Sequence, residues 1–477
     1  MKQQFINGQF VDALDKQAFD VLNPATEELV SLVSFGNDKD CLLAIDAAHL
    51  AFATWSKTTP YQRAEILKKA ANNIREKIDA IAHDMVLESG KPLPEAKGEI
   101  AVAANLFEWY AEEAKRSYGK VIPTNRIDKR SSVIYQPMGV IGIITAWNFP
   151  AYNPARAWAA ALAAGCTVVA KPAEDTPLTA YHLANALQNA GLPNGVLNIV
   201  LGNAPAIGQA MLHHPQLKKI SFTGSTRVGK LLMDGASKTH TKLSLELGGN
   251  APVLIFDDVD VDAIAKTAAI SRFRNNGQVC TSAQRFYVHK NIFEEFKTLI
   301  TKYVSDLKVG NGFDDGVNVG PLITKKQQDS VLALLDKAKA EGAEILTGGD
   351  IPSQFNKGYF LQPCVVAGLT QTSALAQNEI FGPVLPLFSF EDLDDAIAKA
   401  NDTEYGLAAY IFTNNLKTAT LTSEKLEFGI VGINEWAPHG TESPFGGWKQ
   451  SGQGHESGSE GLFEYLEKKL ISVGGLA

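Results

Sequence analysis

The chain contains 477 residues, 45% of them hydrophobic and 20% charged, with 44 Lys and Arg against 52 Asp and Glu. A net charge of −8 without a long basic run argues against nucleic acid or an anionic membrane as a partner, because neutralising phosphates takes clustered Lys and Arg. The length exceeds that of one hydrophobic core, so we expect two or three lobes.

The N-terminus and the cysteines predict a cytoplasmic protein with free thiols. The first residues, MKQQF, contain no apolar signal region, and the longest apolar stretch, 157–170, is too short to span a bilayer. The cysteines show neither CxxC spacing nor a metal-ligand pattern, so we expect no metal site. Apolar neighbours predict that three of them are packing residues: Cys41, Cys166 and Cys364.

Short apolar runs alternate with segments of helix length through the first half of the chain. In chain order the pattern predicts a strand at 140–146, a helix at 155–164, a strand at 167–171, a helix at 179–190, strands at 196–200 and 218–222, and a helix at 228–237. This alternation is typical of βαβ units that build a parallel sheet.

A second alternating series follows Pro252, so the break near Gly248 and Gly249 is expected to separate two α/β lobes. Two further segments, 124–131 and 465–473, look extended. Neither can bury itself alone, so each is expected to pair with another part of the protein. The second series predicts a strand at 253–256, a helix at 262–272, a strand at 285–289, helices at 291–307 and 325–341, and a strand at 343–347.

Polar residues follow the first two predicted strands, and ligands of open α/β sheets bind at the carboxyl ends of strands. Asn148 lies just before the turn at Pro150, and its amide suits a developing oxyanion, although an Asn in a turn is also a common structural residue. Lys171 and Glu174 follow the next strand. They suit ribose hydroxyls, or alternatively form a solvated charge pair.

Two later segments carry further candidate ligand-binding residues. Gly224 and Ser225 open a helix and suit a diphosphate at its N-terminus, although Ser225 equally suits a helix cap. Glu379 and Phe381 flank a rigid turn. They suit a ribose and a nicotinamide ring, or are a surface acid beside a buried ring. The glycine-rich stretch around Phe445 suits either a substrate funnel or a tight corner.

The most informative pair is Cys280, framed by small polar residues and glycine, and Glu246, which precedes Gly248 and Gly249. A thiol in such surroundings suits a nucleophile that a substrate must reach. A carboxylate followed by two glycines suits a side chain held where the backbone comes close. Together they predict a thioester formed by the cysteine and hydrolysed by water that the glutamate activates.

These motifs together resemble the aldehyde dehydrogenase superfamily over nearly the whole chain. The resemblance implies a Rossmann-type cofactor lobe, a second α/β catalytic lobe, a β oligomerisation arm, and a homodimer or homotetramer. It is carried by the Asn148 segment, 171–174, 223–226, 246–249, the Cys280 segment, 379–383 and 444–447. The implied regions are 1–116 with 137–248 for the cofactor, 249–448 for catalysis, and 117–136 with 449–477 for the arm and the C-terminal segment.

The resemblance also implies a role for each matching residue. Cys280 attacks an aldehyde, Asn148 and the Cys280 N–H stabilise the oxyanion, Glu246 activates water, and Glu456 relays protons. Glu174 matches an acid that binds the adenosine ribose and would repel a 2′-phosphate, which predicts NAD over NADP. The residues implied at the cofactor are Trp147, Lys171, Glu174, Gly224, Ser225, Leu247, Glu379 and Phe381.

Within the superfamily, the chain is similar to bacterial succinate-semialdehyde dehydrogenases. Arg156 and Arg274 match positions that grip the distal carboxylate there, which suits Arg because its planar fork meets a carboxylate with two hydrogen bonds. Ion pairs within the fold are the alternative for both. His439 lies where that subfamily often has serine, which leaves the substrate open, and it joins Phe445 among the expected substrate contacts.

Several alternatives remain at this stage. The anchor loop and the cysteine segment also resemble α-ketoglutarate-semialdehyde dehydrogenases, and a general-specificity aldehyde dehydrogenase is a further possibility. Glu246 argues against a CoA-acylating enzyme, because acyl transfer gains nothing from a hydrolytic base. The retention of Cys280, Glu246 and Asn148 argues against a non-catalytic protein. Ser282 stands where some relatives have a second cysteine, so no disulfide switch is expected.

Overall fold

The first lobe is built on an eight-stranded sheet. The computed structural model describes residues 2–476, and the strand order in this sheet is β2-β1-β9-β8-β7-β10-β11-β21. The stretch from β9 to β11 is parallel, and the edge strands β1, β2 and β21 are added antiparallel. The bounds are β1 Gln4–Ile6, β2 Gln9–Val11, β7 Val140–Ile144, β8 Thr167–Lys171, β9 Leu197–Ile199, β10 Leu217–Thr223, β11 Lys242–Glu246 and β21 Gly452–Gln453.

The strand order reverses beside β7, since the chain proceeds from β7 to β8 and β9 on one side and to β10 and β11 on the other. In an open α/β sheet, ligands bind in the crevice at such a switch point, outside the carboxyl ends of the strands. The Asn148 segment follows β7, and Gly224 follows β10. Both sides of the crevice therefore carry residues that the sequence singled out.

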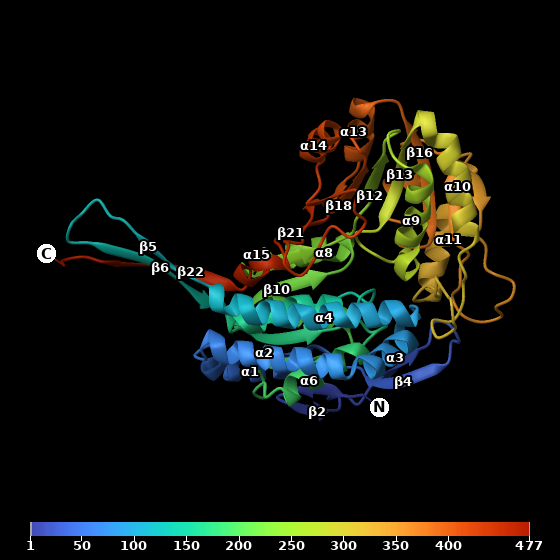
Figure 1. Cartoon of the computed structure of the whole chain (residues 1–477). Coiled ribbons are helices and arrows are strands. Elements are labelled where there is room, and N and C mark those ends of the chain that lie inside the picture. The colour runs from blue at the N-terminus through green and yellow to red at the C-terminus, as the bar shows by residue number, and fades with distance from the viewer. Residues whose placement is uncertain (1, 477) are drawn as a thin grey trace.

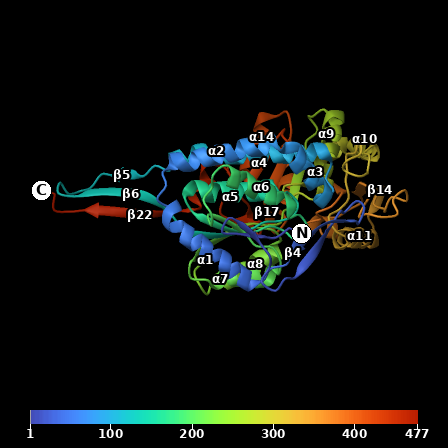
Figure 2. The same cartoon turned by 90° about the horizontal axis from the view of Figure 1, so that it is seen from below.

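Helices cover both faces of this sheet (Figures 1 and 2). Helices α1, α7 and α8 pack on one face around one apolar cluster, and α2 to α6 pack on the other around a larger cluster. The bounds are α1 Asp38–Trp55, α2 Pro60–Glu76, α3 Ile78–Ser89, α4 Leu93–Glu113, α5 Tyr152–Ala164, α6 Leu178–Asn189, α7 Ala204–His213 and α8 Thr226–Ala236.

The second lobe holds a seven-stranded sheet in the order β14-β15-β16-β13-β12-β18-β19, parallel except for β14. Along β12, Val253 and Ile255 pack toward one face and Leu254 toward the other, as expected for a strand covered on both sides. The strands are β12 Ala251–Ile255, β13 Ala283–His289, β14 Glu344–Thr347, β15 Cys364–Ala367, β16 Val384–Phe390, β18 Ala408–Phe412 and β19 Ile430–Ile433.

The remaining elements complete the two lobes. The helices of the second lobe are α9 Val261–Phe273, α10 Phe293–Ser305, α11 Lys325–Ala340, α12 Ala374–Gln377, α13 Leu393–Asn401 and α14 Leu416–Lys425, and α15 Gly458–Phe463 packs on α5. Two small pairs are β3 Ala18–Leu22 with β4 Leu29–Ser34, and β17 Tyr405–Gly406 with β20 Trp448–Lys449.

A three-stranded antiparallel arm, β22-β6-β5, extends away from both lobes (Figures 1 and 2). Its strands are β5 Lys120–Ile122, β6 Arg130–Pro137 and β22 Leu466–Val473. The extended segment expected at 465–473 is present and pairs with β6. The one expected at 124–131 is wrong in position, because residues 123–129 connect β5 to β6 and the strands lie on either side.

The predicted α/β class and the alternation of strands and helices are confirmed. The strand at 167–171 has its predicted bounds, and the other predicted elements of the two series differ by at most three residues at either end. One larger shift is at α5, predicted from 155, which begins at Tyr152. Another is at α10, predicted from 291, which begins at Phe293 after a 3-10 turn at Lys290–Ile292.

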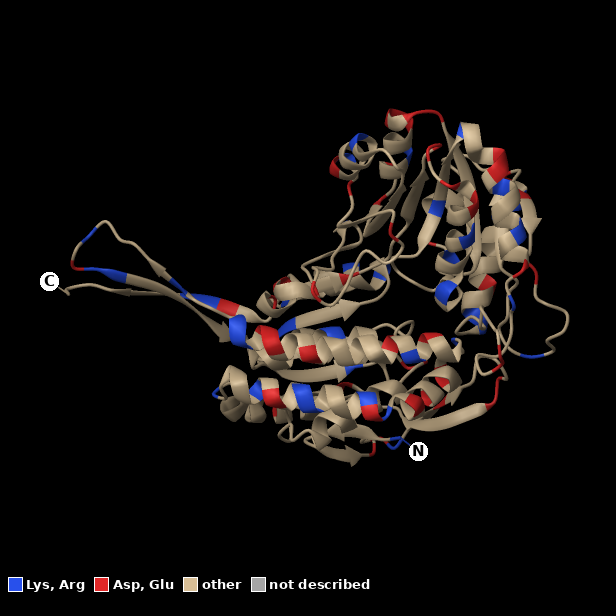
Figure 3. Cartoon of the chain, in the orientation of Figure 1, with Lys and Arg blue, Asp and Glu red and all other residues tan. Residues whose placement is uncertain are grey.

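Basic and acidic side chains mix along the outer helices (Figure 3). Between α2 and α4, for example, Lys68 pairs with Glu112 and Arg75 with Glu108. Such exposed pairs contribute little stability each, about 0 to 1 kcal/mol. None of the helices between residues 2 and 476 combines the length and the apolar character needed to cross a bilayer.

Candidate active site

A cavity of about 410 Å³ lies where the two lobes meet, and Cys280 is part of its wall. The first lobe contributes the start of α4 and α5. The second lobe contributes the cysteine segment and the loop before Phe445. The lining residues are Lys91, Glu95, Gly98, Glu99, Val102, Phe149, Tyr152, Asn153, Arg156, Arg274, Val279, Cys280, Thr281, Ala437, His439, Gly440 and Phe445.

A strained turn presents Cys280. Asn275, Asn276 and Gly277 have φ values of 49°, 57° and 70°, a left-handed run that side chains other than glycine adopt only at a cost. Below the turn, the buried Arg272 donates to the carbonyls of Gly382 and Val384 and to the Ser282 hydroxyl, at 2.6 to 2.9 Å. These hydrogen bonds fix the cysteine segment within the second lobe, next to residues 382–384.

The two glycines after Glu246 allow the lobes to approach each other. A Cβ on Gly249 would lie 2.3 Å from the Cys280 carbonyl oxygen, and one on Gly248 would lie 2.7 Å from a Glu379 carboxylate oxygen. The backbone contact leaves room only for glycine at 249, whereas a Cβ at 248 would require the Glu379 side chain to move. The expectation that the backbone comes close after Glu246 is confirmed.

Cys280 lies in an environment that keeps its thiol protonated. The pKa of the thiol is raised to about 12, chiefly by burial, with the Arg156 guanidinium acting to lower it and the Glu246 charge to raise it. Within residues 2–476, no acceptor contacts the Cys280 backbone N–H, so this donor is free for a ligand atom. The other cysteines, Cys41, Cys166 and Cys364, are buried as predicted.

Glu246 ends β11, and both of its carboxylate oxygens are buried without a hydrogen-bond partner among the described residues. Burial raises the pKa of Glu246 well above its ordinary range, with Arg156 acting to lower it and Glu456 to raise it. An unsatisfied buried carboxyl is expensive in a folded protein. Such a group therefore suits a place where a ligand or a water enters.

Arg156 and Glu456 form an ion pair at the buried end of the cavity. Only 1% of Arg156 is exposed, and its guanidinium stacks over the Phe445 ring at 4.2 Å and the Tyr152 ring at 5.0 Å. The other Glu456 oxygen accepts a hydrogen bond of 3.1 Å from the Ser221 hydroxyl. Of the interpretations that the sequence left open for Arg156, the ion pair within the fold is therefore present, although Arg156 also lines the cavity.

Arg274 differs from Arg156 in its surroundings. It is exposed at the cavity wall, and its nearest aromatic ring is Phe149 at 5.5 Å. Among residues 2–476, no carboxylate lies within ion-pair distance of its guanidinium and it makes no hydrogen bond; burial raises the pKa of Glu95 in the same cavity, while the charges of Lys91 and Arg274 act to lower it. Nearby, the His439 ring packs edge-on against Phe445 at 5.1 Å, and its buried Nδ1 has no partner in the described chain. Burial lowers the pKa of His439 to about 4, as do the charges of Arg274 and Arg156.

Asn148 is held with its side-chain amide toward the cysteine segment. Its Oδ1 accepts a hydrogen bond of 3.2 Å from the Asn153 amide, and its Nδ2 donates to the Gln278 carbonyl at 3.1 Å. Gln278 is two residues before Cys280. The structure therefore brings Asn148, Cys280, Glu246, Arg156 and Glu456 together at the junction of the lobes.

Most of the residues predicted to bind a cofactor follow adjacent parallel strands. Lys171 ends β8 and forms an ion pair with Glu174, but Lys171 is buried, so the pair is not the solvated one that the sequence left open. The Gly224 N–H donates to the Glu246 carbonyl at 2.9 Å and is not free for a phosphate, contrary to the use expected for it. Ser225 caps α8 and remains exposed. Leu247 is buried against α8 beside Gly229.

The second lobe contributes two further residues that were predicted to bind the cofactor, Glu379 and Phe381. Glu379 accepts a hydrogen bond of 3.0 Å from the Gly249 N–H, and burial raises its pKa to about 7 although that N–H acts to lower it. Phe381 has a φ of 49° and packs edge-on against Trp147 at 5.4 Å. Acceptors, a lysine and two rings at the switch point fit the ribose hydroxyls and the nicotinamide of a dinucleotide.

The structure adds residues that the sequence analysis did not place in a site. Lys91, Glu95 and Glu99 line the cavity from the start of α4. The two carboxylates stand four residues apart and so share one helix face. That spacing was visible in the sequence, but nothing there showed which segment the face would meet. No cluster of potential metal ligands is present among residues 2–476.

Comparison with known proteins gives a consistent result. Residues 10–471 match the model of the aldehyde dehydrogenase family. The chain is 45% identical to the NADP(+) succinate-semialdehyde dehydrogenase GabD of Escherichia coli (strain K12), over 99% of this chain and 98% of that one. It is 43% identical to the glutarate-semialdehyde dehydrogenase of Pseudomonas putida, with the same coverage.

Among solved structures, betaine aldehyde dehydrogenase from Staphylococcus aureus in complex with NAD+ superposes with a TM-score of 0.97 at 36% identity, covering 99% of this chain and 95% of that one. The resemblance deduced from the sequence motifs is confirmed by these matches, and so is the fold that it implied.

Proposed function

This chain belongs to the aldehyde dehydrogenase family, and from that premise we propose that it oxidises an ω-carboxy aldehyde, succinic semialdehyde or a close analogue, to the acid with NAD. The observation that supports the substrate class best is Arg274, a guanidinium without a carboxylate partner in the same cavity as Cys280. A carboxylate that enters the cavity would supply the missing partner.

The first half of the reaction builds the thioester. The Cys280 thiol gives up its proton to water that enters the cavity, and the resulting thiolate attacks the aldehyde carbon, so that a C–S bond forms while the carbonyl electron pair moves to oxygen. The Asn148 amide and the free Cys280 N–H donate to that oxygen, which carries developing negative charge. A bound nicotinamide supplies the hydride acceptor. Loss of hydride from the tetrahedral carbon restores the carbonyl and leaves the acyl group on Cys280.

The second half releases the acid. Glu246 takes a proton from water, the water oxygen attacks the thioester carbon, and the C–S bond breaks to return Cys280. A general base works best when its pKa lies near the working pH, and burial has raised the pKa of Glu246 in that direction. Glu456, whose charge acts on Glu246 and which contacts Ser221 and Arg156, would pass the proton on.

The substrate proposal is tested by comparing kcat/KM, with NAD, for succinic semialdehyde and for butyraldehyde, which lacks the distal carboxylate. If Arg274 pairs with the distal carboxylate inside the cavity, kcat/KM should favour the acid by about a hundredfold or more, on the order of 3 kcal/mol. A ratio near one would overturn the proposal and indicate a general aldehyde dehydrogenase.

A second substrate class is supported by His439. Its buried Nδ1 has no partner and lies in the wall of the same cavity. A semialdehyde with an extra acceptor beside the carboxylate, as in α-ketoglutarate semialdehyde, would satisfy it. This substrate belongs in the same assay. A higher kcat/KM than for succinic semialdehyde, lost in His439→Ser, would favour this second class.

NAD is proposed over NADP because of Glu174. Its carboxylate would repel a 2′-phosphate, and it holds the Lys171 ammonium in an ion pair. We expect kcat/KM to be at least about tenfold higher with NAD than with NADP. Glu174→Gln should lower this NAD-to-NADP ratio, because Lys171 would then be free to bind the 2′-phosphate. Asp175→Asn, a change in the neighbouring carboxylate, is the matched control. The name of the Escherichia coli relative includes NADP(+). An equal or higher kcat/KM with NADP would overturn the proposal.

The arm is proposed to join copies of the chain into a dimer or tetramer. Val121 and Leu470 are 86% and 65% exposed on it. Exposed apolar side chains on a narrow sheet favour burial against another surface. Size-exclusion chromatography with light scattering checks this, and a monomer would contradict it. The division into regions 1–116 with 137–248, 249–448, and 117–136 with 449–477 is proposed on the same family basis.

A further inference from the structure

A buried ion pair on the first lobe has no role in the steps above. Lys91, just before α4, and Glu99, in its second turn, are 3% and 7% exposed and pair with each other. Both charges have left water, and burying an ion pair often gives no net stability compared with apolar side chains of similar size. The question is therefore what this pair holds in place.

Glu99 holds the start of α5. One of its oxygens accepts hydrogen bonds from the backbone N–H groups of Ala151 at 2.8 Å and Tyr152 at 3.1 Å. Ala151 stands at the N-cap of α5 and has no side chain that could cap the helix. The first N–H groups of a helix need outside acceptors and favour a negative charge. Glu99, which belongs to the neighbouring helix α4, supplies the acceptor and the negative charge.

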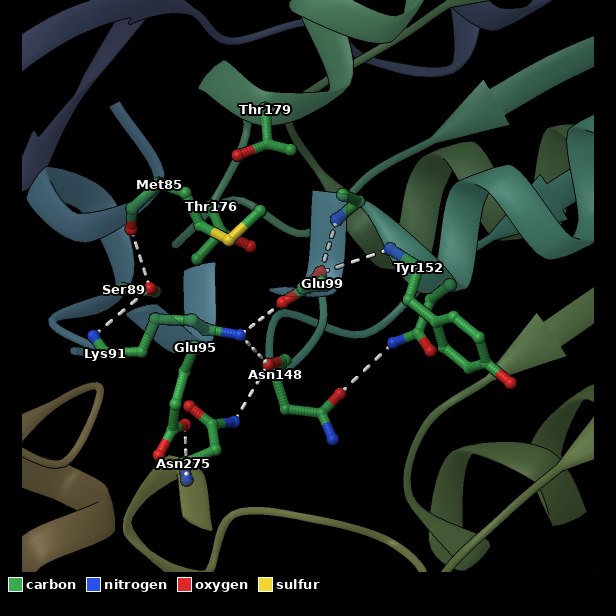
Figure 4. A network of polar contacts seen from close by, with 12 residues as sticks. Met85, Ser89, Lys91, Glu95, Glu99, Asn148, Tyr152, Thr176, Thr179 and Asn275 are labelled. Atoms are coloured by element: carbon green, nitrogen blue, oxygen red, sulfur yellow. Dashed lines mark hydrogen bonds and ion pairs between the residues drawn. The ribbon is translucent and has the colours of Figure 1, made fainter. Parts of the chain in front are cut away.

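Lys91 holds the backbone of Asn148. Its Nζ donates to the Asn148 carbonyl at 3.0 Å, and the Asn275 side-chain amide donates to the same oxygen at 2.9 Å (Figure 4). Asn275 belongs to the strained turn before Cys280, and its N–H donates to the Glu95 carboxylate at 2.8 Å. Lys91 and Glu95 thus connect the Asn148 segment to the cysteine segment across the two lobes.

We propose that Lys91 and Glu99 are positioning residues for the reaction, which fix the Asn148 backbone between α4 and α5 so that its side-chain amide stays directed at the oxyanion formed on Cys280. The inference rests on the proposed function, since it needs Asn148 to act as an oxyanion donor. Lys91 acts here through Asn148 and makes no contact with the reacting atoms. Catalysis by such donors is sensitive to displacements of about 1 Å, so a tie to the backbone matters.

The test is a double-mutant cycle on the rate of NADH formation in a single turnover at saturating NAD. Asn148→Ala alone should lower this rate by about 10²- to 10³-fold, the usual effect of losing one oxyanion donor. Lys91→Met, which keeps the length of the side chain, should lower it by about 10- to 100-fold in the wild-type background. In the Asn148→Ala background, Lys91→Met should change it by less than about threefold, because a residue that acts only through Asn148 has nothing left to position.

An equal loss from Lys91→Met in both backgrounds would overturn the proposal, since it would mean that Lys91 acts on the substrate or on stability alone. If Lys91→Met does not fold, Glu99→Gln replaces it in the same cycle with the same expectation. Glu88→Gln is the matched control. Glu88 is a buried glutamate that accepts from the Leu178 and Thr179 N–H groups at the start of α6, away from the cavity. It should leave the single-turnover rate within about twofold.

Different results would contradict the proposed function rather than the positioning role of Lys91 and Glu99. A wild-type enzyme that forms no NADH with any aldehyde, or an Asn148→Ala variant with the full single-turnover rate, would contradict the oxyanion assignment itself. A slow Asn148→Ala variant combined with an unchanged Lys91→Met variant contradicts only the positioning proposal.

Discussion

The two ends of the active-site cavity use arginine in opposite ways. At the buried end, Arg156 is paired with Glu456 and enclosed by the rings of Tyr152 and Phe445. At the open end, Arg274 is exposed and has no carboxylate partner in the described chain. The sequence predicted the same role for both residues, that of an anchor for the distal carboxylate of the substrate.

The difference shows that charge type and family position do not determine what a side chain is free to do. The buried Arg272 donates to backbone carbonyls, whereas Arg156 has Glu456 as its polar partner among the described residues, so Arg156 depends on Glu456 whether or not substrate is present. Arg274 is solvated at rest and loses little when it waits for a ligand. We therefore expect the buried end to govern stability and chemistry, and the open end to govern substrate affinity.

The largest expected effect sharpens this comparison at its buried end. Glu246→Gln should lower steady-state turnover by about 10²- to 10⁴-fold, because the thioester loses its general base. Acyl transfer to Cys280 does not need that base, so the variant should still release about one NADH per active site in a burst. Rapid-mixing absorbance at saturating NAD measures both phases.

Cys280→Ala is the control for the burst, because it removes the nucleophile and should abolish both phases. Full steady-state turnover by Glu246→Gln would show that another group activates the water. In that case Glu246 would not be the general base that releases the acid.

The next effect compares the two arginines directly. Arg156→Met leaves Glu456 buried without its partner and should lower the free energy of unfolding by about 3 to 5 kcal/mol. Arg274→Met should change it by less than about 0.5 kcal/mol, as for other exposed positions. Arg274→Met should instead raise KM for succinic semialdehyde by about 10- to 100-fold and leave KM for butyraldehyde unchanged.

Chemical unfolding measures the change in stability of the two variants, and initial-rate kinetics measure the change in KM. A similar loss of stability in both would mean that Arg274 is a structural residue in solution. An unchanged KM for succinic semialdehyde in Arg274→Met would remove the observation on which the substrate proposal depends.

Much of the fold could be predicted because its signals are local. The apolar run at 167–171 is a strand with those bounds, and the switch between strand and helix patterns marked both lobes. The arm was harder. Apolar and polar residues follow no clear pattern in 124–131, and β6, with which β5 pairs, itself pairs with β22, more than 300 residues later. Long-range pairing leaves little trace in a local pattern.

The site was predictable to the extent that single motifs carry it. Cys280, Glu246 and Asn148 each follow a strand or lie beside glycines, and their segments do converge. The ties between segments were not predictable, because they join residues that are remote in sequence. The pairs of Arg156 with Glu456 and of Lys91 with the Asn148 carbonyl are such ties, and nothing local marks one partner for the other.

The smallest expected effect concerns His439 and pH at the open end. Burial lowers the pKa of His439 to about 4, so between pH 6 and 8 its ring is neutral, while arginines remain charged throughout. KM for succinic semialdehyde should therefore vary by less than about twofold over this range. If His439 titrated near its ordinary value of about 6.5, affinity for the anion would fall as pH rises through that value and the ring loses its charge. His439→Asn, which keeps a neutral polar side chain, should give the same flat profile. A slope in the wild-type enzyme that disappears in this variant would assign a charge to His439 and place two cations, Arg274 and His439, at the open end.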